Sequence, residues 1–177
     1  VIILAAAIVM SYRSDDSYVD VFSMPGSNKI VVIDSGHGGW YPGKVAEDGP
    51  LEKDINVAIA LKLQQYLEQG GFYVVMTRVD DTALGDGKQS DMTGRKEISN
   101  TSQGDIMVSV HQNSYTSGNV SGPQVFYFDK ADESRMLAES IQEQLTSFLD
   151  SPKKRVAKSN DYYYMLKKTT IPSVIVE

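Results

Sequence analysis

The chain has 177 residues, about the length of one domain, of which 41% are hydrophobic and 23% charged, so it is neither disordered nor collagen-like. Its net charge of −6, from 17 lysines and arginines against 23 aspartates and glutamates, argues against nucleic acid as the main partner, because an anionic surface repels phosphate backbones. The absence of cysteine excludes disulfides, iron–sulfur clusters and thiol nucleophiles.

Residues 1–10, VIILAAAIVM, form an uncharged apolar run. Ten residues are too few to span a bilayer, which takes about 20, but they match the apolar part of a signal peptide or membrane anchor that begins before residue 1. We favour an uncleaved anchor, with a buried first strand or helix as the alternative. Residues 11–28 are polar and interrupted by Pro25-Gly26, which predicts a linker. The folded domain is therefore expected over residues 29–177.

Strand and helix patterns alternate along this domain. Runs of β-branched and aromatic residues predict strands over 29–34, 72–77, 105–110, 124–128 and 173–176. Apolar residues spaced by three and four predict helices over 52–69 and 133–149. A polar, glycine-containing stretch predicts a surface loop over 79–90, and a short helix is expected over 91–100, with Asp91 or Thr93 as its cap. The expected apolar faces are Ile55, Ile59, Leu63, Tyr66 and Leu67 in the first helix, and Leu137, Ile141, Leu145 and Phe148 in the last. The alternation indicates βαβ units in an α/β fold, with a mixed, mostly parallel sheet covered on both faces.

The chain has two histidines, His37 and His111, and each follows the C-terminal end of a predicted strand. In open α/β sheets, ligands bind at this edge. The run Ser35-Gly36-His37-Gly38-Gly39 is flexible enough to bring backbone close to a bound ion or substrate. A single histidine in such a turn is usually a hydrogen-bonded turn residue. Because two histidines follow equivalent strand ends here, a metal site and a turn role are both open interpretations.

A carboxylate is needed to complete such a site, because catalytic zinc is often held by two histidines and one carboxylate, with a fourth position left for water. Glu52, in the first turn of the helix predicted over 52–69, is the natural candidate. Its alternative role is stabilisation of the helix dipole. Other candidates for the third ligand are Asp54, Glu47 and Asp48, and composition does not favour one of them over another.

Glu177 follows the apolar run 174–176, at the end of another predicted strand. A charge buried there would require a cation or a proton to compensate it. Beside a metal ion, the carboxylate could accept and return the proton of an attacking water. The alternative is a solvated glutamate at an exposed strand end.

Four segments together resemble the zinc-dependent N-acetylmuramoyl-L-alanine amidases of the third amidase family. They occur in the family's order and with similar spacing, between about residue 29 and residue 177. The segments are Asp34-Ser35-Gly36-His37-Gly38-Gly39, Leu51-Glu52-Lys53-Asp54-Ile55-Asn56, Ser109-Val110-His111-Gln112-Asn113-Ser114 and Pro172-Ser173-Val174-Ile175-Val176-Glu177. Residues 122–127 and 154–158 are similar to the spore-cortex, germination-specific branch.

The resemblance implies that His37, Glu52 and His111 bind one zinc ion per chain and that Glu177 is the catalytic acid/base. It implies a sheet of about six strands and hydrolysis of the amide between the lactyl group of N-acetylmuramic acid and L-alanine of the peptidoglycan stem peptide. In the spore branch, this reaction prepares the sugar for conversion to muramic-δ-lactam by a separate deacetylase. Such a substrate implies an extracytoplasmic protein, secreted or membrane-anchored, at the forespore surface in that branch.

Two departures from the family pattern accompany the resemblance. Ser35 stands where the family usually has proline, which mainly rigidifies the turn. The family also continues past the catalytic glutamate, so we expect the natural domain to extend beyond Glu177. Two other functions stay open: a non-catalytic amidase-like module that binds peptidoglycan or a protein, and a zinc hydrolase of another amide.

Weaker expectations concern residues around the site. Asp34 is expected to steady His37, and Asn113 to hydrogen-bond nearby, with simple turn roles as alternatives. Arg155 belongs to a basic cluster within residues 153–168 that is a solvated face or steers anionic peptidoglycan toward the site. Tyr162-Tyr163-Tyr164 is expected in the core, with stacking on sugar rings as the alternative.

Overall fold

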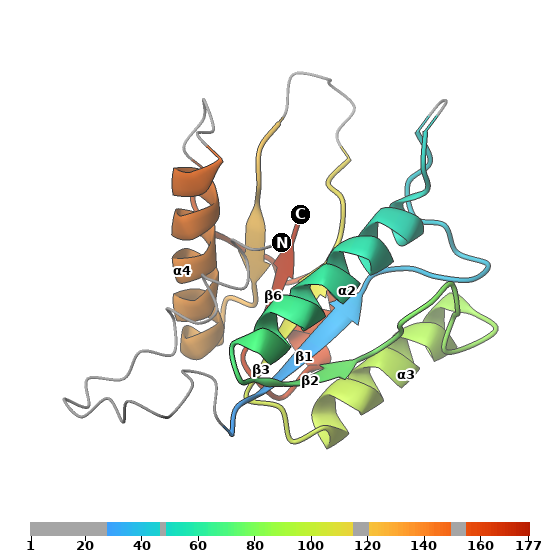
Figure 1. Ribbon diagram of the computed structural model, residues 1–177, viewed down its shortest axis with the longest axis horizontal. Helices are drawn as coiled ribbons and strands as arrows, with labels where there is room; N and C mark the ends of the chain where they lie inside the picture. Colours follow the sequence, from blue (N-terminus) through green and yellow to red (C-terminus); the bar gives the residue numbers. More distant parts are fainter. Residues whose placement is uncertain (1–27, 47–48, 115–120, 150–154) are drawn as a thin grey trace.

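Six strands form one sheet in the order β2-β1-β3-β6-β4-β5. They belong to a computed structural model that describes residues 28–46, 49–114, 121–149 and 155–177 (Figure 1). The strands are β1 (Ile30–Ser35), β2 (Tyr73–Met76), β3 (Ile106–Val110), β4 (Val125–Tyr127), β5 (Lys158–Ser159) and β6 (Ser173–Val176). Neighbouring strands pair in parallel, except β4 and β6, which are antiparallel. The mixed, mostly parallel sheet is thus confirmed.

Helices cover both faces of this sheet. The described helices are α2 (Glu52–Gln69), α3 (Lys88–Thr101), α4 (Asp132–Phe148) and α5 (Tyr164–Lys168). Helices α2 and α4 lie on one face, with α2 over β1 and α4 beside β4 (Figure 1), and α3 and α5 pack on the other. The expected single α/β domain is confirmed.

The sequence of β1 explains why both faces are covered. Successive side chains of a strand point to opposite faces. Val31 and Ile33 join the apolar cluster beneath α2 and α4, whereas Val32 joins Met107 and Met165 in the second cluster, beneath α3 and α5. A continuous β-branched run is typical of a strand buried on both sides.

The register of the central strands places three chain segments at one edge of the sheet. Strands β1, β3 and β6 are neighbours and parallel, with Ser35 opposite Val110 and Val110 opposite Val176. The residues that follow these strands therefore emerge side by side, and they include His37 and His111.

Helix α3 begins at Lys88, three residues earlier than predicted. Ser90 explains this start, because its hydroxyl accepts a hydrogen bond from the Gly87 amide and donates one to the Gly87 carbonyl. Asp91 was expected as a cap, but its carboxylate accepts from the Leu84 amide and from Arg95. The loop predicted up to residue 90 is accordingly shorter.

The buried faces of two helices also differ from expectation. In α2, Lys53, Asn56 and Ala60 are buried, while Ile55 and Ile59 are only partly buried. The polar members of this stripe are close to the site described below. In α4, by contrast, Phe148 is 69% exposed, because it lies in the helix's last turn, at the rim of the core.

The segment before β6 contains two elements that the sequence did not predict, β5 and α5. Both are too short to show a periodic pattern. The prediction that the three tyrosines are in the core is wrong for Tyr162, which is 94% exposed. Tyr164 is partly buried against the second apolar cluster, and Tyr163 is partly buried too.

The predicted anchor, residues 1–10, and the predicted linker up to residue 27 lie outside the described residues. Within the described ranges, no helix has the length and apolar character that crossing a bilayer requires.

Candidate active site

Two buried arginines hold the loop that carries His37. The Arg95 side chain donates to the carbonyl oxygens of Ser35 at 2.6 Å and of His37 at 2.6 Å. The Arg78 side chain donates to the carbonyls of Ser35 at 2.8 Å and Gly36 at 2.9 Å. Three consecutive carbonyls therefore turn toward guanidinium groups. His37 adopts a left-handed conformation with φ 61°, which is uncommon for a non-glycine residue, and these hydrogen bonds stabilise it.

Arg95 is itself paired with two carboxylates. It is 2% exposed, and it donates to Asp34 Oδ1 at 2.9 Å and to Asp91 Oδ2 at 2.7 Å. Burial by itself would raise the pKa of Asp34, but the charge of Arg95, together with hydroxyl donors from Ser109 and Thr77, outweighs it and lowers this pKa. A charged, hydrogen-bonded cluster thus lies directly beneath the His37 loop.

Glu52 is the first residue of α2 and is 5% exposed. Its carboxylate accepts hydrogen bonds from the backbone amides of Lys44, at 2.8 Å, and Gln112, at 3.1 Å, rather than from its own first turn. Both amides lie outside α2, so they aim the carboxylate away from the helix axis. The carboxylate is thus directed toward the segments that carry Lys44 and Gln112.

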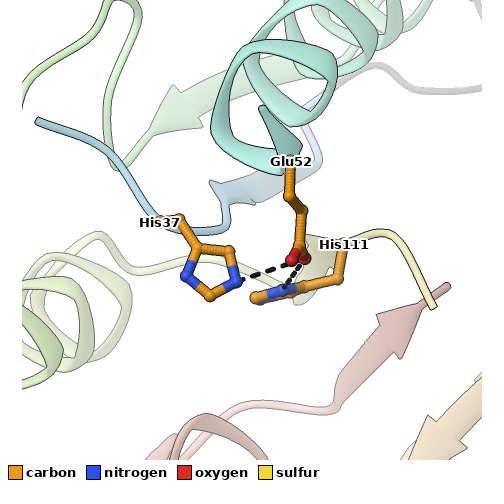
Figure 2. Close-up of side chains that lie close together, drawn as sticks. All are labelled: His37, Glu52 and His111. Carbon is orange, nitrogen blue, oxygen red and sulfur yellow. Dashed lines mark hydrogen bonds and ion pairs between the residues drawn. The ribbon is translucent and has the colours of Figure 1, made fainter. Parts of the chain in front are cut away.

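Figure 2 shows the side chains of His37, Glu52 and His111 pointing toward one another from three different chain segments. His37 Nε2 lies 3.2 Å from Glu52 Oε1, and His111 Nδ1 lies 3.0 Å from the same oxygen. The two imidazole rings are edge-to-face, with centroids 4.8 Å apart. One donor atom from each of the three residues lies within 4.8 Å of the others.

Two glycines allow this close approach. A Cβ atom at Gly36 would overlap the ring of His111. A Cβ at Gly43, where φ is +72°, would lie 2.6 Å from both Glu52 Oε2 and His37 Cδ2. Side chains at these two positions would push the donor atoms apart.

The donor set fits a divalent metal ion. Two imidazole nitrogens and a carboxylate oxygen are the typical protein ligands of catalytic zinc. Burial by itself would raise the pKa of Glu52, but its hydrogen bonds to His111, His37 and backbone amides outweigh it and hold the pKa well below 4.5. Glu52 is therefore ionised, as a ligand must be.

Glu177 follows β6 and lies in the same cavity as the three donors. Its backbone pairs with Gln124 in both directions, at 2.7 and 2.9 Å, and Tyr163 donates a hydrogen bond to its Oε1 at 3.1 Å. Burial, and less strongly the charge of Glu52, raises the pKa of this carboxyl, while Tyr163 and His111 act in the opposite direction. This partly buried position differs from the exposed strand end that was the alternative.

The cavity has a volume of about 980 Å³ and is lined by both histidines, Glu52 and Glu177. Its size is within the range typical of small-molecule sites. Asn113, which is exposed, also lines it. The three predicted ligands and the predicted acid/base thus share one hollow.

Two further residues were predicted near the site, Asp34 and Arg155. Asp34 lines the cavity, and it reaches His37 through Arg95, which donates to both residues. Arg155 is not among the described residues that line the cavity.

Sequence reasoning missed Arg78, Arg95, Gln112 and the hydrogen-bonding role of Tyr163. The spacing of Asp91 and Arg95 by four residues in a helix was a usable signal for an ion pair. The other roles depend on pairings between distant segments, so no local pattern reveals them.

Comparison with known proteins places these residues in a family. Residues 31–177 match the family model described as N-acetylmuramoyl-L-alanine amidase. The germination-specific N-acetylmuramoyl-L-alanine amidase of Bacillus subtilis (strain 168) is 33% identical over 184 residues, which cover 99% of this chain and 76% of that protein.

Solved structures agree with this placement. The CwlD amidase of Clostridioides difficile, in complex with the GerS lipoprotein, is similar with a TM-score of 0.81 and 37% identity, over 85% of this chain and 81% of that one. The amidase AmiC2 of Nostoc punctiforme has a TM-score of 0.73 and 32% identity, over 86% and 79%. The chain belongs to the N-acetylmuramoyl-L-alanine amidase family and is a peptidoglycan amidase.

Proposed function

We propose that this amidase is zinc-dependent, with His37, Glu52 and His111 as the ligands of one zinc ion. The observation that carries the proposal is the convergence of their three donor atoms within 4.8 Å. When bound, zinc lowers the pKa of a coordinated water toward about 7 and polarises a carbonyl oxygen. The three residues lie in segments far apart in the sequence, after β1, at the start of α2 and after β3, and the fold brings them together.

Glu177 is the acid/base of the proposed reaction. Its carboxylate accepts a proton from the water that attacks the lactyl carbonyl of N-acetylmuramic acid. It then returns that proton to the nitrogen of L-alanine as the carbon–nitrogen bond breaks, so that an amine rather than an amide anion departs. Its partial burial supports this role, because burial raises the pKa of the carboxyl toward the working pH.

The test combines metal analysis with digestion of purified muropeptides. We expect about one zinc per chain, release of stem peptide with free N-terminal L-alanine, and loss of release after chelation. His111→Ala should lose the zinc, whereas the exposed variant Glu139→Gln should retain it. Zinc binding without stem-peptide release would point to a hydrolase of another amide, and the absence of both would point to a binding module.

The proposed biological substrate is spore-cortex peptidoglycan, where peptide removal precedes muramic-δ-lactam formation. The similarity to the Bacillus subtilis germination-specific amidase supports this assignment. Because peptidoglycan lies outside the cytoplasmic membrane, the site of action is extracytoplasmic, at the forespore surface. Expression in a spore former that lacks its own germination-specific amidase should restore muramic-δ-lactam in the cortex. A cortex that still lacks the lactam would contradict the spore role without affecting the amidase activity.

A further inference from the structure

We infer that Tyr163 is a positioning residue for Glu177, holding one oxygen of the acid/base carboxylate so that the other is free for proton transfer. This inference rests on the proposed role of Glu177. Its basis is the hydrogen bond of 3.1 Å from the Tyr163 hydroxyl to Glu177 Oε1, at the wall of the cavity. Within the described ranges no hydrogen bond is made to Oε2, so the carboxylate has one tethered and one untethered oxygen.

Tyr163 is suited to this task because its own position is strongly constrained. Its backbone amide donates to Asn160 Oδ1 at 3.0 Å, and its carbonyl accepts from the amide of Lys167, in the last turn of α5. Its ring packs edge-on against Phe126 of β4, with centroids 5.4 Å apart. The hydroxyl is therefore presented from a fixed backbone and a packed ring.

The segment that carries Tyr163 is tied to the same sheet as Glu177. The Asn160 amide donates to the carbonyl of Tyr127 at 2.8 Å, and β5 pairs with β4. Strand β4 in turn pairs with β6, which leads directly into Glu177. Donor and acceptor are thus attached to one hydrogen-bonded sheet, which limits how far they can separate.

The Tyr163 hydroxyl affects the ionisation of Glu177 together with the charged groups around it. Burial and the charge of Glu52 raise the pKa of Glu177 and so disfavour its ionised form. Tyr163 and His111 lower this pKa and favour the ionised form. Burial and the negative charge of Glu177 raise the pKa of Tyr163 to about 12. The phenol therefore stays a neutral donor at physiological pH, and it stabilises the carboxylate form that must accept the proton.

The variant that tests the inference is Tyr163→Phe, which removes the hydroxyl and keeps the ring packed on Phe126. The free energy of a hydrogen bond to a charged group is large enough that its loss in Tyr163→Phe should lower kcat about 10- to 100-fold. KM should change less than about threefold. The acidic limb of the kcat profile should move to higher pH, because loss of the donor disfavours the ionised carboxylate. Tyr66→Phe is the matched control, since Tyr66 is also partly buried but lies near the far end of α2.

A second readout does not depend on turnover. Titration of ¹³C-labelled glutamate carboxyls by NMR, with Glu177 assigned from the signal lost in Glu177→Gln, should show a higher pKa in Tyr163→Phe than in Tyr66→Phe. If the kcat, its pH profile and this titration are the same in the two tyrosine variants, the inference is overturned while the amidase mechanism stands. If Glu177→Gln turns over like the wild type, the proposed function fails and the inference fails with it.

Discussion

Arg95 and His37 are joined by a hydrogen bond of 2.6 Å from the guanidinium Nη2 to the backbone carbonyl of the histidine. The same guanidinium is paired with Asp34 and Asp91 and is almost completely buried. The backbone of a proposed metal ligand is therefore supported by a buried, charged cluster. Such support matters because a ligand must stay close to its productive geometry.

Replacing Arg95 by leucine should destabilise the fold strongly. Two carboxylates would be left buried without their cation, and breaking a buried ion pair from one side costs about 3–5 kcal/mol. Urea unfolding followed by circular dichroism measures this loss. The control is Arg135→Leu, which removes an exposed ion pair with Asp132 and should cost less than about 1 kcal/mol. Equal losses in the two variants would contradict a supporting role for Arg95.

Asp34 should make the stability of the protein dependent on pH. Its pKa in the folded state lies below the ordinary value of 3.8, so the ionised group stabilises the fold above that pH, and this contribution is lost as pH falls through the lowered pKa. The difference in unfolding free energy between wild type and Asp34→Asn should therefore shrink on acidification from pH 7 to pH 3. In the Arg95→Leu background, where burial still raises the pKa of Asp34 but the cation no longer lowers it, this decrease on acidification should be smaller or reversed. A difference that grows on acidification would refute the assigned direction.

Gly36→Ala should weaken metal binding, because the added methyl group would overlap the imidazole of His111. We expect zinc affinity to fall about 10- to 100-fold, a range typical of changes that disturb the support of a ligand. Competition with a chromogenic chelator measures the affinity. Gly87→Ala is the matched control, because a Cβ there meets its nearest neighbour, Ser90 Oγ, at 3.7 Å and φ is −145°. Equal zinc affinity in both variants would show that His111 does not need this space.

Glu177→Gln should separate metal binding from catalysis. Glutamine keeps the size of the side chain but is no proton acceptor, so kcat for stem-peptide release should drop about 10²- to 10⁴-fold while zinc content stays near one per chain. Product release from muropeptides and metal content are measured on the same preparation. Glu139→Gln, on the exposed face of α4, should behave like the wild type. Loss of zinc from Glu177→Gln would instead assign the carboxylate to the metal.

The local sequence pattern was sufficient to predict the positions of the elements that are long or strongly apolar. Helix α2 begins and ends at the predicted residues, Glu52 and Gln69, because an apolar repeat runs between a loop and a Gly-Gly stop. Helix α3 was placed less well because its start depends on the side-chain hydrogen bonds of Ser90 rather than on hydrophobic spacing. Strand β5 has two residues and no pattern of its own, so it exists only through pairing with β4.

By itself, the sequence determined the α/β class, the family and the positions of His37, His111 and Glu177 after strand-forming runs, because these properties depend on short-range periodicity and motif order. Only the tertiary structure decided that β1, β3 and β6 are neighbours, that Arg95 is buried beneath the His37 loop and that Tyr163 reaches Glu177. Strand order and buried pairings join residues far apart in the chain. Their free energy comes from packing and charge pairing of the whole domain, which no local segment contains.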